Sequence, residues 1–428
     1  MYHNSTPVIS SPISLLEMNV AYFLAFFLLS AASGDDCISD KSQLAHIRLR
    51  KALLCDYDRN LRPVLAYKDP VRVFIRMVLK YYNYDIHDNS FTIDSWFAMS
   101  WVDQHLKWAP DDYDALTTLH LADADIWVPD LSVYNRREQS GNPAVFDQAT
   151  CLVSHLGQVS CVPPVHHTSI CVADLTKYPF DTHNCTIRFG SWVHSGEELD
   201  IQVAKNGINT EDLVPNGEWE LEETRIVKHP GIFKCCPNNT YPSINFSFRI
   251  RRQAGAHAAS VILPAIALII LTFASLWLSP QNNQRLVLCY INLVNEFLYV
   301  QYISWMVPMS GDKIPLILLF ARDSLLLSAF AVVFSLMVKN MAERDNKMAP
   351  AWVSKIVCVF VAFKPGQVIF LDETSFKALG NEEDGAAILP QDGGQKTSEW
   401  RILGQILDRI FFLIYLVVYL VMIIGFTP

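Results

Sequence analysis

The sequence predicts a membrane protein in two parts, an all-β, immunoglobulin-like extracellular sandwich followed by an all-α bundle of four transmembrane helices. Three observations support this fold class. The chain has 428 residues, too many for one ordinary domain. Its first half is polar, with short β-like runs separated by turn residues. Its second half contains four apolar stretches, each near the ~20 residues needed to cross a bilayer.

The N-terminal residues 1–34 are expected to be a secretory signal peptide. The apolar run Val20–Leu29 is followed by small residues as far as Gly34. At about ten residues the run is too short to cross a bilayer, which is typical of a signal peptide. A buried N-terminal helix is the alternative. The mature extracellular domain is then expected over residues 35–253.

The cysteines are concentrated ahead of the membrane spans. Eight of the ten lie before residue 237, namely Cys37, Cys55, Cys151, Cys161, Cys171, Cys185, Cys235 and Cys236. An even set behind a signal peptide indicates disulfides formed in the secretory pathway. They lack the spacing of zinc ligands, so neither a metal nor another cofactor is expected. Glycosylation sequons at Asn184, Asn238 and Asn245 agree with secretion.

Two cysteine pairs are candidates for a functional role. Cys171 and Cys185 enclose thirteen residues with Tyr-Pro-Phe-Asp near their centre, and closing such a loop contributes about 3 kcal/mol. The loop is either a structural staple or a rigid element that rests on the membrane domain and transmits movement. Cys235 and Cys236 are adjacent, so they either form a strained vicinal disulfide at a loop tip or bridge separately to Cys37 and Cys55. With a vicinal pair, the remaining bridges are Cys151–Cys161, across a hairpin, and Cys37–Cys55.

Short runs between turn residues predict the strands of the sandwich. Examples are Val71–Tyr81, Ser90–Val102, Ile126–Val133, Thr168–Asp174, Thr186–Val193 and Ile244–Ile250. A helix is expected earlier, over Lys41–Leu54. Aromatic side chains are dense in this region: Trp96, Trp101, Trp108, Trp127, Tyr134, Trp192, Trp219, Phe233 and Tyr241. Each is either a core residue or part of a cage that holds an amine by cation–π attraction.

Four apolar stretches come next, Ala256–Leu278, Leu286–Val307, Ile314–Met337 and Ile410–Phe426. They predict transmembrane helices over 254–278, 285–307, 314–338 and 401–428. Residues 339–400 between the last two are expected to form an intracellular loop with helical ends and a disordered linker. Lys339, Arg344 and Lys347 in that loop agree with the positive-inside tendency. The protein is therefore expected in the plasma membrane, with its N-terminal domain outside.

Polar residues interrupt the second and third spans. Asn292, Asn295 and Glu296 are expected to face neighbouring helices, because an unpaired carboxylate in a bilayer is costly. At about 1.5 Å per residue, Glu296 and Arg322 lie at similar depths. We expect these two side chains to pair between helices.

Charge and motifs exclude other classes of function. The formal net charge of −9 disfavours nucleic acid as a partner. His166-His167 lacks a metal-ligand or catalytic partner at suitable spacing, and no phosphate loop or nucleophile motif occurs, so no enzyme is expected. An adhesion receptor would not need four spans.

From about Ala45 to its end the sequence resembles the Cys-loop receptors, which are pentameric ligand-gated ion channels, and among them the nicotinic acetylcholine type. The resemblance is carried by WFAMSWVDQHLKWAPDDY (96–113), IWVPDLSVYN (126–135), CVADLTKYPFDTHNC (171–185), FGSWV (189–193), PNGEWEL (215–221), KCCPNNTYP (234–242) and SEWRILGQILDR (398–409). It implies a ring-shaped pentamer with four further subunits, of this chain or of different chains, in the lipid bilayer.

The resemblance also implies a small-molecule agonist, an amine by the aromatic character of the site, at subunit interfaces. The principal face would be Tyr134, Trp192, Phe233, Cys235, Cys236 and Tyr241, and the complementary face Trp96, Leu152, Ser160 and Val162. Phe233 stands where agonist-binding members usually carry Tyr. Agonist would close the cysteine-pair loop, and the Cys171–Cys185 loop would press on the connector Met309–Ile314.

By the same resemblance, the second span lines the pore. The pore-facing row would be Gln284, Val287, Ile291, Val294, Leu298, Gln301 or Tyr302, and Trp305. Val294 and Leu298 would form apolar rings that gate by dewetting. Gln284 replaces the Glu of cation-selective members, and the Pro-Ala-Arg run of anion-selective members is missing. The alternative function is a non-conducting accessory subunit that needs a partner chain.

Overall fold

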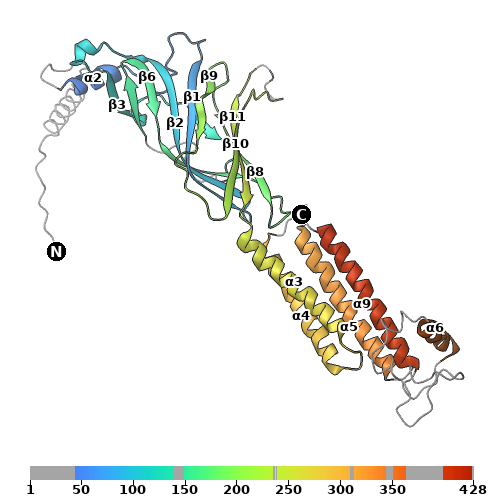
Figure 1. Ribbon diagram of the computed structural model, residues 1–428. Coiled ribbons are helices and arrows are strands. Elements are labelled where there is room, and N and C mark those ends of the chain that lie inside the picture. The colour runs from blue at the N-terminus through green and yellow to red at the C-terminus, as the bar shows by residue number, and fades with distance from the viewer. Residues whose placement is uncertain are drawn as a thin grey trace, which may run out of the picture.

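The structure is a computed structural model and describes residues 44–137, 149–234, 237, 239–308, 313–343, 350–362 and 399–426. A β-sandwich stands end to end on a bundle of long helices (Figure 1). The two parts are joined where strand β11 (Ser243–Arg252) leads into helix α3 (Gly255–Trp277). The predicted fold class is confirmed.

The larger sheet has strand order β3-β5-β6-β2-β1-β9, with β7 also paired to β2. Its strands are β1 (Val71–Asp85), β2 (Ser90–Lys107), β3 (Thr118–Ala122), β5 (Thr150–Ser154), β6 (Leu156–Cys161), β7 (Pro164–Ile170) and β9 (Leu199–Asn209). The β1–β9 pair is parallel and the other pairs are antiparallel. Buried and exposed residues alternate along β2, so one face of the sheet covers the core while the other faces outward.

The smaller sheet has the order β10-β11-β8-β4, from β10 (Trp219–His229), β11, β8 (Thr182–Ser191) and β4 (Leu131–Val133). Aromatic rings join the two sheets. Phe97 of β2 stacks on Phe189 of β8 at 4.8 Å between ring centroids, and Phe91 meets Phe248 of β11 at 5.4 Å. These contacts form the centre of the sandwich core.

The dense aromatic residues divide between core and surface. Trp101, Trp127 and Trp219 are buried, whereas Trp96 and Trp192 are exposed. Apolar rings usually enter the core unless something else covers them. The exposed pair therefore contains the candidates for binding.

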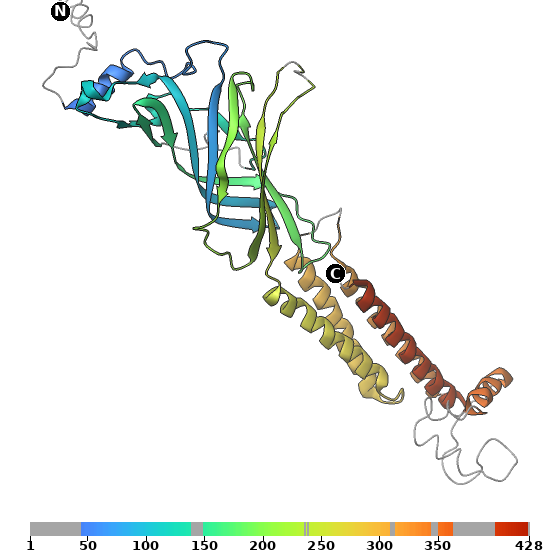
Figure 2. The ribbon, with the colours of Figure 1, turned by 45° about the horizontal axis from the view of Figure 1, so that its top comes forward.

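Disulfides join segments of the sandwich. Cys151–Cys161 joins β5 to β6, and Cys171–Cys185 closes the loop between β7 and β8. Cys55 is disulfide-bonded, while Cys37 lies outside the described residues. Cys55 directly follows helix α2 (Ala45–Leu54), whose Leu49 is fully buried against the sandwich. The N-terminal helix was expected, and it caps the end of the domain farthest from the bundle (Figure 2).

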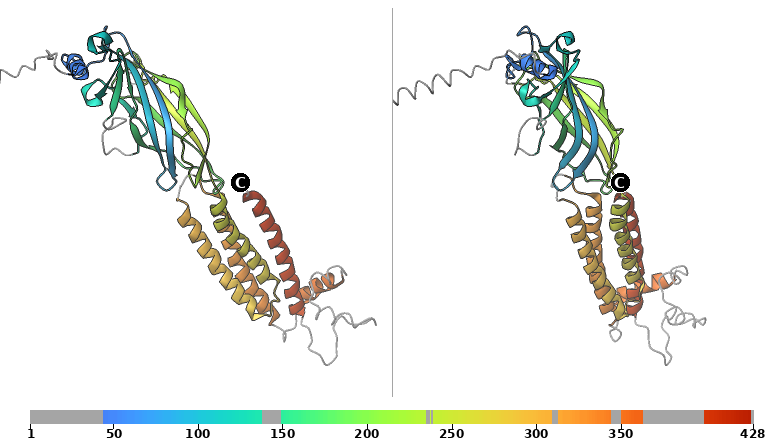
Figure 3. Two further views of the ribbon diagram at one scale, coloured as in Figure 1. Left: turned by 60° about the vertical axis from the view of Figure 1, so that its left-hand side comes forward. Right: turned by 90° about the vertical axis from the view of Figure 1, so that its left-hand side faces the viewer.

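Four described helices are long and apolar enough to cross a membrane. They are α3, α4 (Asn283–Met306), α5 (Leu316–Ala342) and α9 (Glu399–Phe426). The C-terminal end of α9 lies on the sandwich side, while the short helix α6 (Ala351–Ala362) lies at the opposite end of the bundle (Figure 3). Aromatic rings hold α9 in place, since Phe411 stacks on Phe334 of α5 and Phe412 meets Phe273 of α3.

The sequence-based strands were incomplete. Only Leu131–Val133 of the expected run 126–133 is a strand, and β3, β9 and β10 were missed, whereas β5 and β6 form the hairpin expected between Cys151 and Cys161. In β10 the sequence WELEETRIVKH alternates charged with apolar residues, and most of its side chains are at least partly exposed. The sequence of such a strand contains no clear hydrophobic pattern. Its stability comes from pairing with β11.

Candidate functional site

Two aromatic residues of the predicted principal face meet beside the paired strands β4 and β8. These strands are antiparallel, with Leu131 opposite Ser191 and Val133 opposite Phe189, so the Tyr134 side chain reaches back along β8 to meet Trp192. Their rings pack edge to face at 6.1 Å, and the Tyr134 hydroxyl donates to the Ser191 carbonyl at 2.6 Å. A Cβ at Gly190 would lie 2.4 Å from that hydroxyl, so glycine leaves room for Tyr134. Trp192 is 78% exposed, and its indole is open to a ligand.

A carboxylate supports the backbone of Trp192. Asp130 accepts hydrogen bonds from the Ser191 hydroxyl at 2.7 Å, from the Val193 amide at 3.0 Å and from His194 Nδ1 at 2.8 Å. Ser191 and Val193 flank Trp192, so the carboxylate fixes the turn that presents the indole. Sequence reasoning missed Asp130 and His194. Their only signal was their closeness in sequence to Tyr134 and Trp192.

The β10–β11 hairpin contributes the other two aromatic residues. Phe233 and Tyr241 have ring centroids 6.2 Å apart. Gly231 has φ +65°, and a Cβ there would meet the Tyr241 carbonyl, so this turn requires glycine. The Gly196 amide donates to the Thr240 carbonyl at 2.7 Å and connects the hairpin to the segment after Trp192. Cys235, Cys236 and Asn238 lie outside the described residues.

The predicted complementary residues share the outward face of the larger sheet. Leu152 pairs with Ser160 across β5 and β6, and Ser160 pairs with Ser100 of β2. Trp96, Leu152 and Val162 are exposed, although all three are apolar. The two predicted faces therefore belong to different sheets of one protomer. A complete site would need the principal face of one subunit and the complementary face of another.

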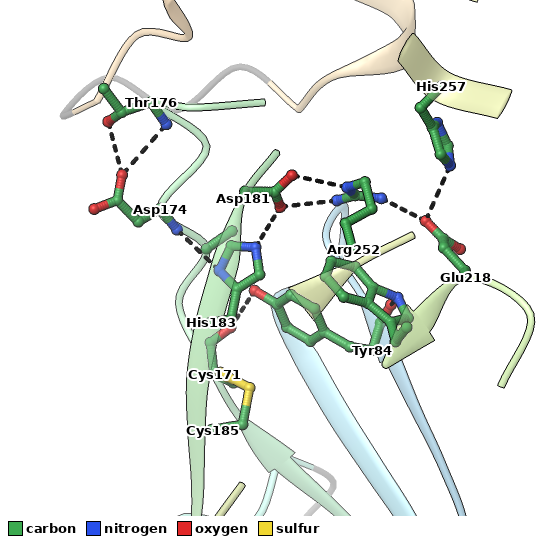
Figure 4. Close-up of polar contacts among 12 residues, drawn as sticks. Tyr84, Cys171, Asp174, Thr176, Asp181, His183, Cys185, Glu218, Arg252 and His257 are labelled. Carbon is green, nitrogen blue, oxygen red and sulfur yellow. Dashed lines mark hydrogen bonds and ion pairs between the residues drawn. A yellow bond between two sulfur atoms is a disulfide. The ribbon is translucent and has the colours of Figure 1, made fainter. Parts of the chain in front are cut away.

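The Cys171–Cys185 loop lies at the junction with the helices (Figure 4). Arg252, at the end of β11, donates to Asp181 of this loop at 2.8 Å and to Glu218 at 2.5 Å. His183 Nε2 lies 2.5 Å from Asp181 Oδ2, and the Asp174 amide donates to His183 Nδ1 at 3.4 Å. Arg252, Asp181 and His183 are almost fully buried. Burial alone would raise the pKa of Asp181, but the His183 and Arg252 contacts outweigh it and lower this pKa to about 2.

The same loop contacts the membrane helices directly. Asp174 forms an ion pair with Lys313, and the Leu316 amide at the start of α5 donates to the Thr176 carbonyl at 3.0 Å. The hydrogen bond from Lys313 lowers the pKa of Asp174 to about 2. At the start of α3, His257 Nδ1 lies 3.1 Å from the Tyr178 hydroxyl.

His257 Nε2 lies 3.5 Å from Glu218, as Figure 4 shows. The two residues border a cavity of about 610 Å³ whose lining also includes Arg252 and Trp305. The loop thus rests on α3 and on the segment that leads into α5. Sequence reasoning expected the loop to press on the connector that contains Lys313, but it missed Arg252 and His257, because partners so distant in sequence leave no local signal.

Helix α4 exposes the side of its surface that was predicted to line a pore. The exposed members of that row in the protomer are Gln284, Val287, Ile291, Val294, Leu298, Gln301 and Trp305, whereas Tyr302, the alternative to Gln301, is half-buried. The opposite side is buried and includes Arg285, Asn292 and Glu296. A mostly apolar exposed face and a partly polar buried face invert the pattern of an ordinary surface helix.

Two expectations for the spans were wrong. Glu296 does not pair with Arg322, because Arg322 is exposed and binds its neighbour Asp323 at 2.8 Å. Instead Glu296 accepts a hydrogen bond from the Ser324 hydroxyl at 2.8 Å. Asn295 is exposed and lies beside the pore-facing row rather than toward neighbouring helices. Similar depth is not sufficient for contact, since the two residues must also face each other.

The sequons differ in accessibility. Asn184 is exposed, whereas Asn245 is buried and its amide oxygen accepts a hydrogen bond from Arg188 Nε at 3.2 Å. A glycan needs a solvent-exposed asparagine. The structure therefore disfavours Asn245 and is compatible with a glycan at Asn184.

Comparison with known proteins identifies relatives along most of the chain. Residues 46–254 match the neurotransmitter-gated ion-channel ligand binding domain. The neuronal acetylcholine receptor subunit alpha-5 of Gallus gallus is 31% identical over 314 residues, which cover 72% of this chain and 68% of the relative. The alpha-3 subunit of Carassius auratus is 30% identical over 77% of this chain and 64% of its own length. The alpha-5 subunit of Pan troglodytes is 27% identical over 90% of this chain and 87% of its own length.

Proposed function

Since this chain belongs to the family of neurotransmitter-gated ion channels, we propose that its agonist is a small amine held between one subunit's aromatic residues and the next subunit's exposed sheet. The chain is a subunit of a ligand-gated channel in the plasma membrane, with its sandwich outside the cell. The family is one of ion channels rather than of enzymes.

The observation that carries this proposal is the exposed indole of Trp192 beside the Tyr134 ring. Indole and phenol faces attract ammonium groups, by up to about 2 kcal/mol when water is excluded. The relatives are named as acetylcholine receptor subunits, so acetylcholine is the first agonist to test. Phe233 retains a ring at the hairpin but cannot donate a hydroxyl hydrogen bond. A ligand recognised mainly by its cationic group fits this set best.

Exposed apolar residues support assembly into a ring of five subunits, formed by this chain alone or with other chains. The outward face of the larger sheet presents Trp96, Leu152 and Val162, which a neighbouring subunit would cover. The exposed row of α4 would face the central axis and line the pore. Val294 and Leu298, each more than half exposed in the protomer, would form the apolar gate.

The signal would pass through the Cys171–Cys185 loop. Movement of the sandwich would reach α3 through Tyr178 and His257, and α5 through Asp174 and Lys313. Because both contacts come from one loop closed by a disulfide, the loop would move as a unit. Tilting of α4 between these helices would open the pore.

Recording from oocytes tests the proposal. We expect current in response to acetylcholine or another small amine, and a rise in EC50 of at least tenfold for Trp192→Ala, on the scale of a lost cation–π contact. Trp192→Phe should be intermediate. Trp108→Phe is the matched control, because Trp108 donates its indole N–H to the Leu116 carbonyl away from this site. Responses only to amino acids, or an unchanged EC50 in Trp192→Ala, would refute the amine site.

A further inference from the structure

We propose that His194 is a specificity-determining residue of the amine site, because its charge together with that of Asp130 sets how strongly the site attracts a cation. The inference rests on the proposed function and names what regulates that site. When His194 is neutral, the Asp130 carboxylate places one negative charge behind Trp192. Protonated His194 cancels that charge, so the affinity for a cationic ligand falls as the pH falls.

The first step concerns the position of Asp130. Its carboxylate accepts hydrogen bonds from Ser191 and Val193, the residues on either side of Trp192. The Tyr134 hydroxyl in turn donates to the Ser191 carbonyl at 2.6 Å. One hydrogen-bonded unit therefore connects the carboxylate with the Tyr134 hydroxyl and with the residues on both sides of Trp192. A charge on this unit lies directly behind the surface that a ligand would contact.

The second step concerns the protons of His194. Its Nδ1 lies 2.8 Å from Asp130 Oδ1. A carboxylate only accepts, so Nδ1 donates to it, and in the neutral ring Nε2 carries no proton. Within the described part of the chain, no hydrogen bond to Nε2 is found, and 23% of the side chain is open to solvent. The ring can therefore take up a second proton from water at Nε2 while Nδ1 keeps its hydrogen bond to Asp130.

The third step shows that the charge reaches the aromatic residues. Burial raises the pKa of Tyr134, the negative charge of Asp130 raises it further, and Arg188 opposes both. Asp130 thus acts electrostatically on a ring of the site itself. A cationic ligand against the same ring would experience the attraction, and protonation of His194 would remove most of it.

The surrounding charges do not change over the same pH range. Arg188 comes from β8 and binds Asn245 of β11, and Glu198 pairs with Arg62. Glu197 accepts a hydrogen bond from Thr240 of the β10–β11 hairpin, which also carries Lys234. Carboxylates, lysines and arginines ordinarily titrate outside the range from about pH 5.5 to 8. The one imidazole in this set belongs to His194, and imidazole is the side chain that ordinarily changes charge between about pH 5 and 8.

The test measures binding of acetylcholine to the purified full-length receptor in lipid nanodiscs at about pH 8 and 5.5. Acetylcholine carries a permanent charge, so any change with pH belongs to the protein. We expect roughly threefold to tenfold weaker binding at the lower pH, the effect of one nearby unit charge partly screened by water. His194→Gln, whose amide can still donate to Asp130, should bind equally well at both pH values.

Two further variants make the result decisive. His194→Lys carries a fixed charge and should bind weakly at both pH values. His46→Gln changes an exposed histidine on α2 and should keep the native pH dependence. Native binding that does not change with pH, or His194→Gln that still responds to pH, would overturn the role of His194 and leave the amine site intact. If neither acetylcholine nor tetramethylammonium binds at either pH, the amine site and this inference both fail.

Discussion

At the scale of single residues, Arg252 connects two carboxylates at the base of the sandwich. Its guanidinium is fully buried and binds Asp181 and Glu218. It also lies over the Trp219 ring at 4.2 Å from the ring centroid. A buried ion pair contributes little net stability, but removing one partner leaves the other charge without compensation.

Arg252→Gln should therefore destabilise the receptor by about 3–5 kcal/mol, because Asp181 stays buried without its cation. Thermal unfolding of the purified receptor measures this loss. Arg251→Gln is the matched control, since Arg251 is the adjacent residue, is half exposed and binds Glu220 and Glu222 at the surface. Its unfolding temperature should stay close to the native value. Equal losses in both variants would contradict the buried pair.

The contact between Arg252 and Asp181 stabilises the protein by an amount that depends on pH. The pKa of Asp181 is about 2 in the folded protein, below its ordinary value of 3.8. Because the pKa of Asp181 is lower in the folded protein, its ionised carboxylate stabilises the fold at pH values above 3.8. This stabilisation is lost as the pH falls through the folded pKa of about 2. The contribution is about 2 kcal/mol. Unfolding temperatures measured from pH 5 down to 2 should fall more steeply for the native receptor than for Arg252→Gln.

At the scale of elements, α4 is held by polar contacts on its buried side. Glu296 accepts a hydrogen bond from Ser324 of α5, whose hydroxyl also lies 3.0 Å from the Tyr419 hydroxyl of α9. Asn292 donates to Thr272 of α3 at 2.9 Å. Near the other end of α4, Arg285 and Asp408 of α9 lie 2.6 Å apart. These contacts place the apolar side of α4 away from its own bundle.

Ser324→Ala should destabilise the bundle by about 1–3 kcal/mol, because it removes the donor to a buried carboxyl group. Glu296→Gln should be milder, since its amide oxygen can still accept from Ser324. Surface expression and thermal stability in detergent measure both effects. Arg322→Ala is the control, as Arg322 lies on the exposed side of α5 and binds Asp323. A loss in Arg322→Ala as large as in Ser324→Ala would mean that Glu296 depends on Arg322 instead.

At the scale of the whole molecule, function depends on contacts between the sandwich and the bundle. Asp174 and Lys313 form an ion pair across this junction, beside the backbone hydrogen bond from Leu316 to Thr176. Both ion-pair side chains are about half exposed, so the pair adds little to stability. Its position suits the transmission of movement better than the maintenance of the fold.

A double-mutant cycle on Asp174→Asn and Lys313→Gln should therefore be non-additive in agonist EC50. We expect each variant to raise the EC50 several-fold and the double variant to raise it no further, a coupling of about 1 kcal/mol. Lys80 and Asp212 provide the control, because they form an exposed ion pair at 2.7 Å within the sandwich. Changes at that pair should leave the EC50 unchanged. Additive effects at the junction would show that the ion pair does not carry the signal.

The sequence alone determined features that depend on local pattern and covalent spacing. Cys171 and Cys185 were close enough along the chain to predict a closed loop, and apolar stretches predicted four membrane helices. The pore-facing row of α4 came from the resemblance and helical periodicity, and its members are exposed when Gln301 rather than Tyr302 is taken. These features can be predicted without knowing which residues pack against them.

Only the tertiary structure decided which residues face each other. It exposed Trp192 while burying Trp101, and it paired Glu296 with Ser324 rather than Arg322. It also brought Arg252 to Asp181, which lies 71 positions earlier in the chain. The physical reason is that burial and hydrogen bonding depend on the element packed opposite. That element is often distant in sequence, so no local pattern specifies it.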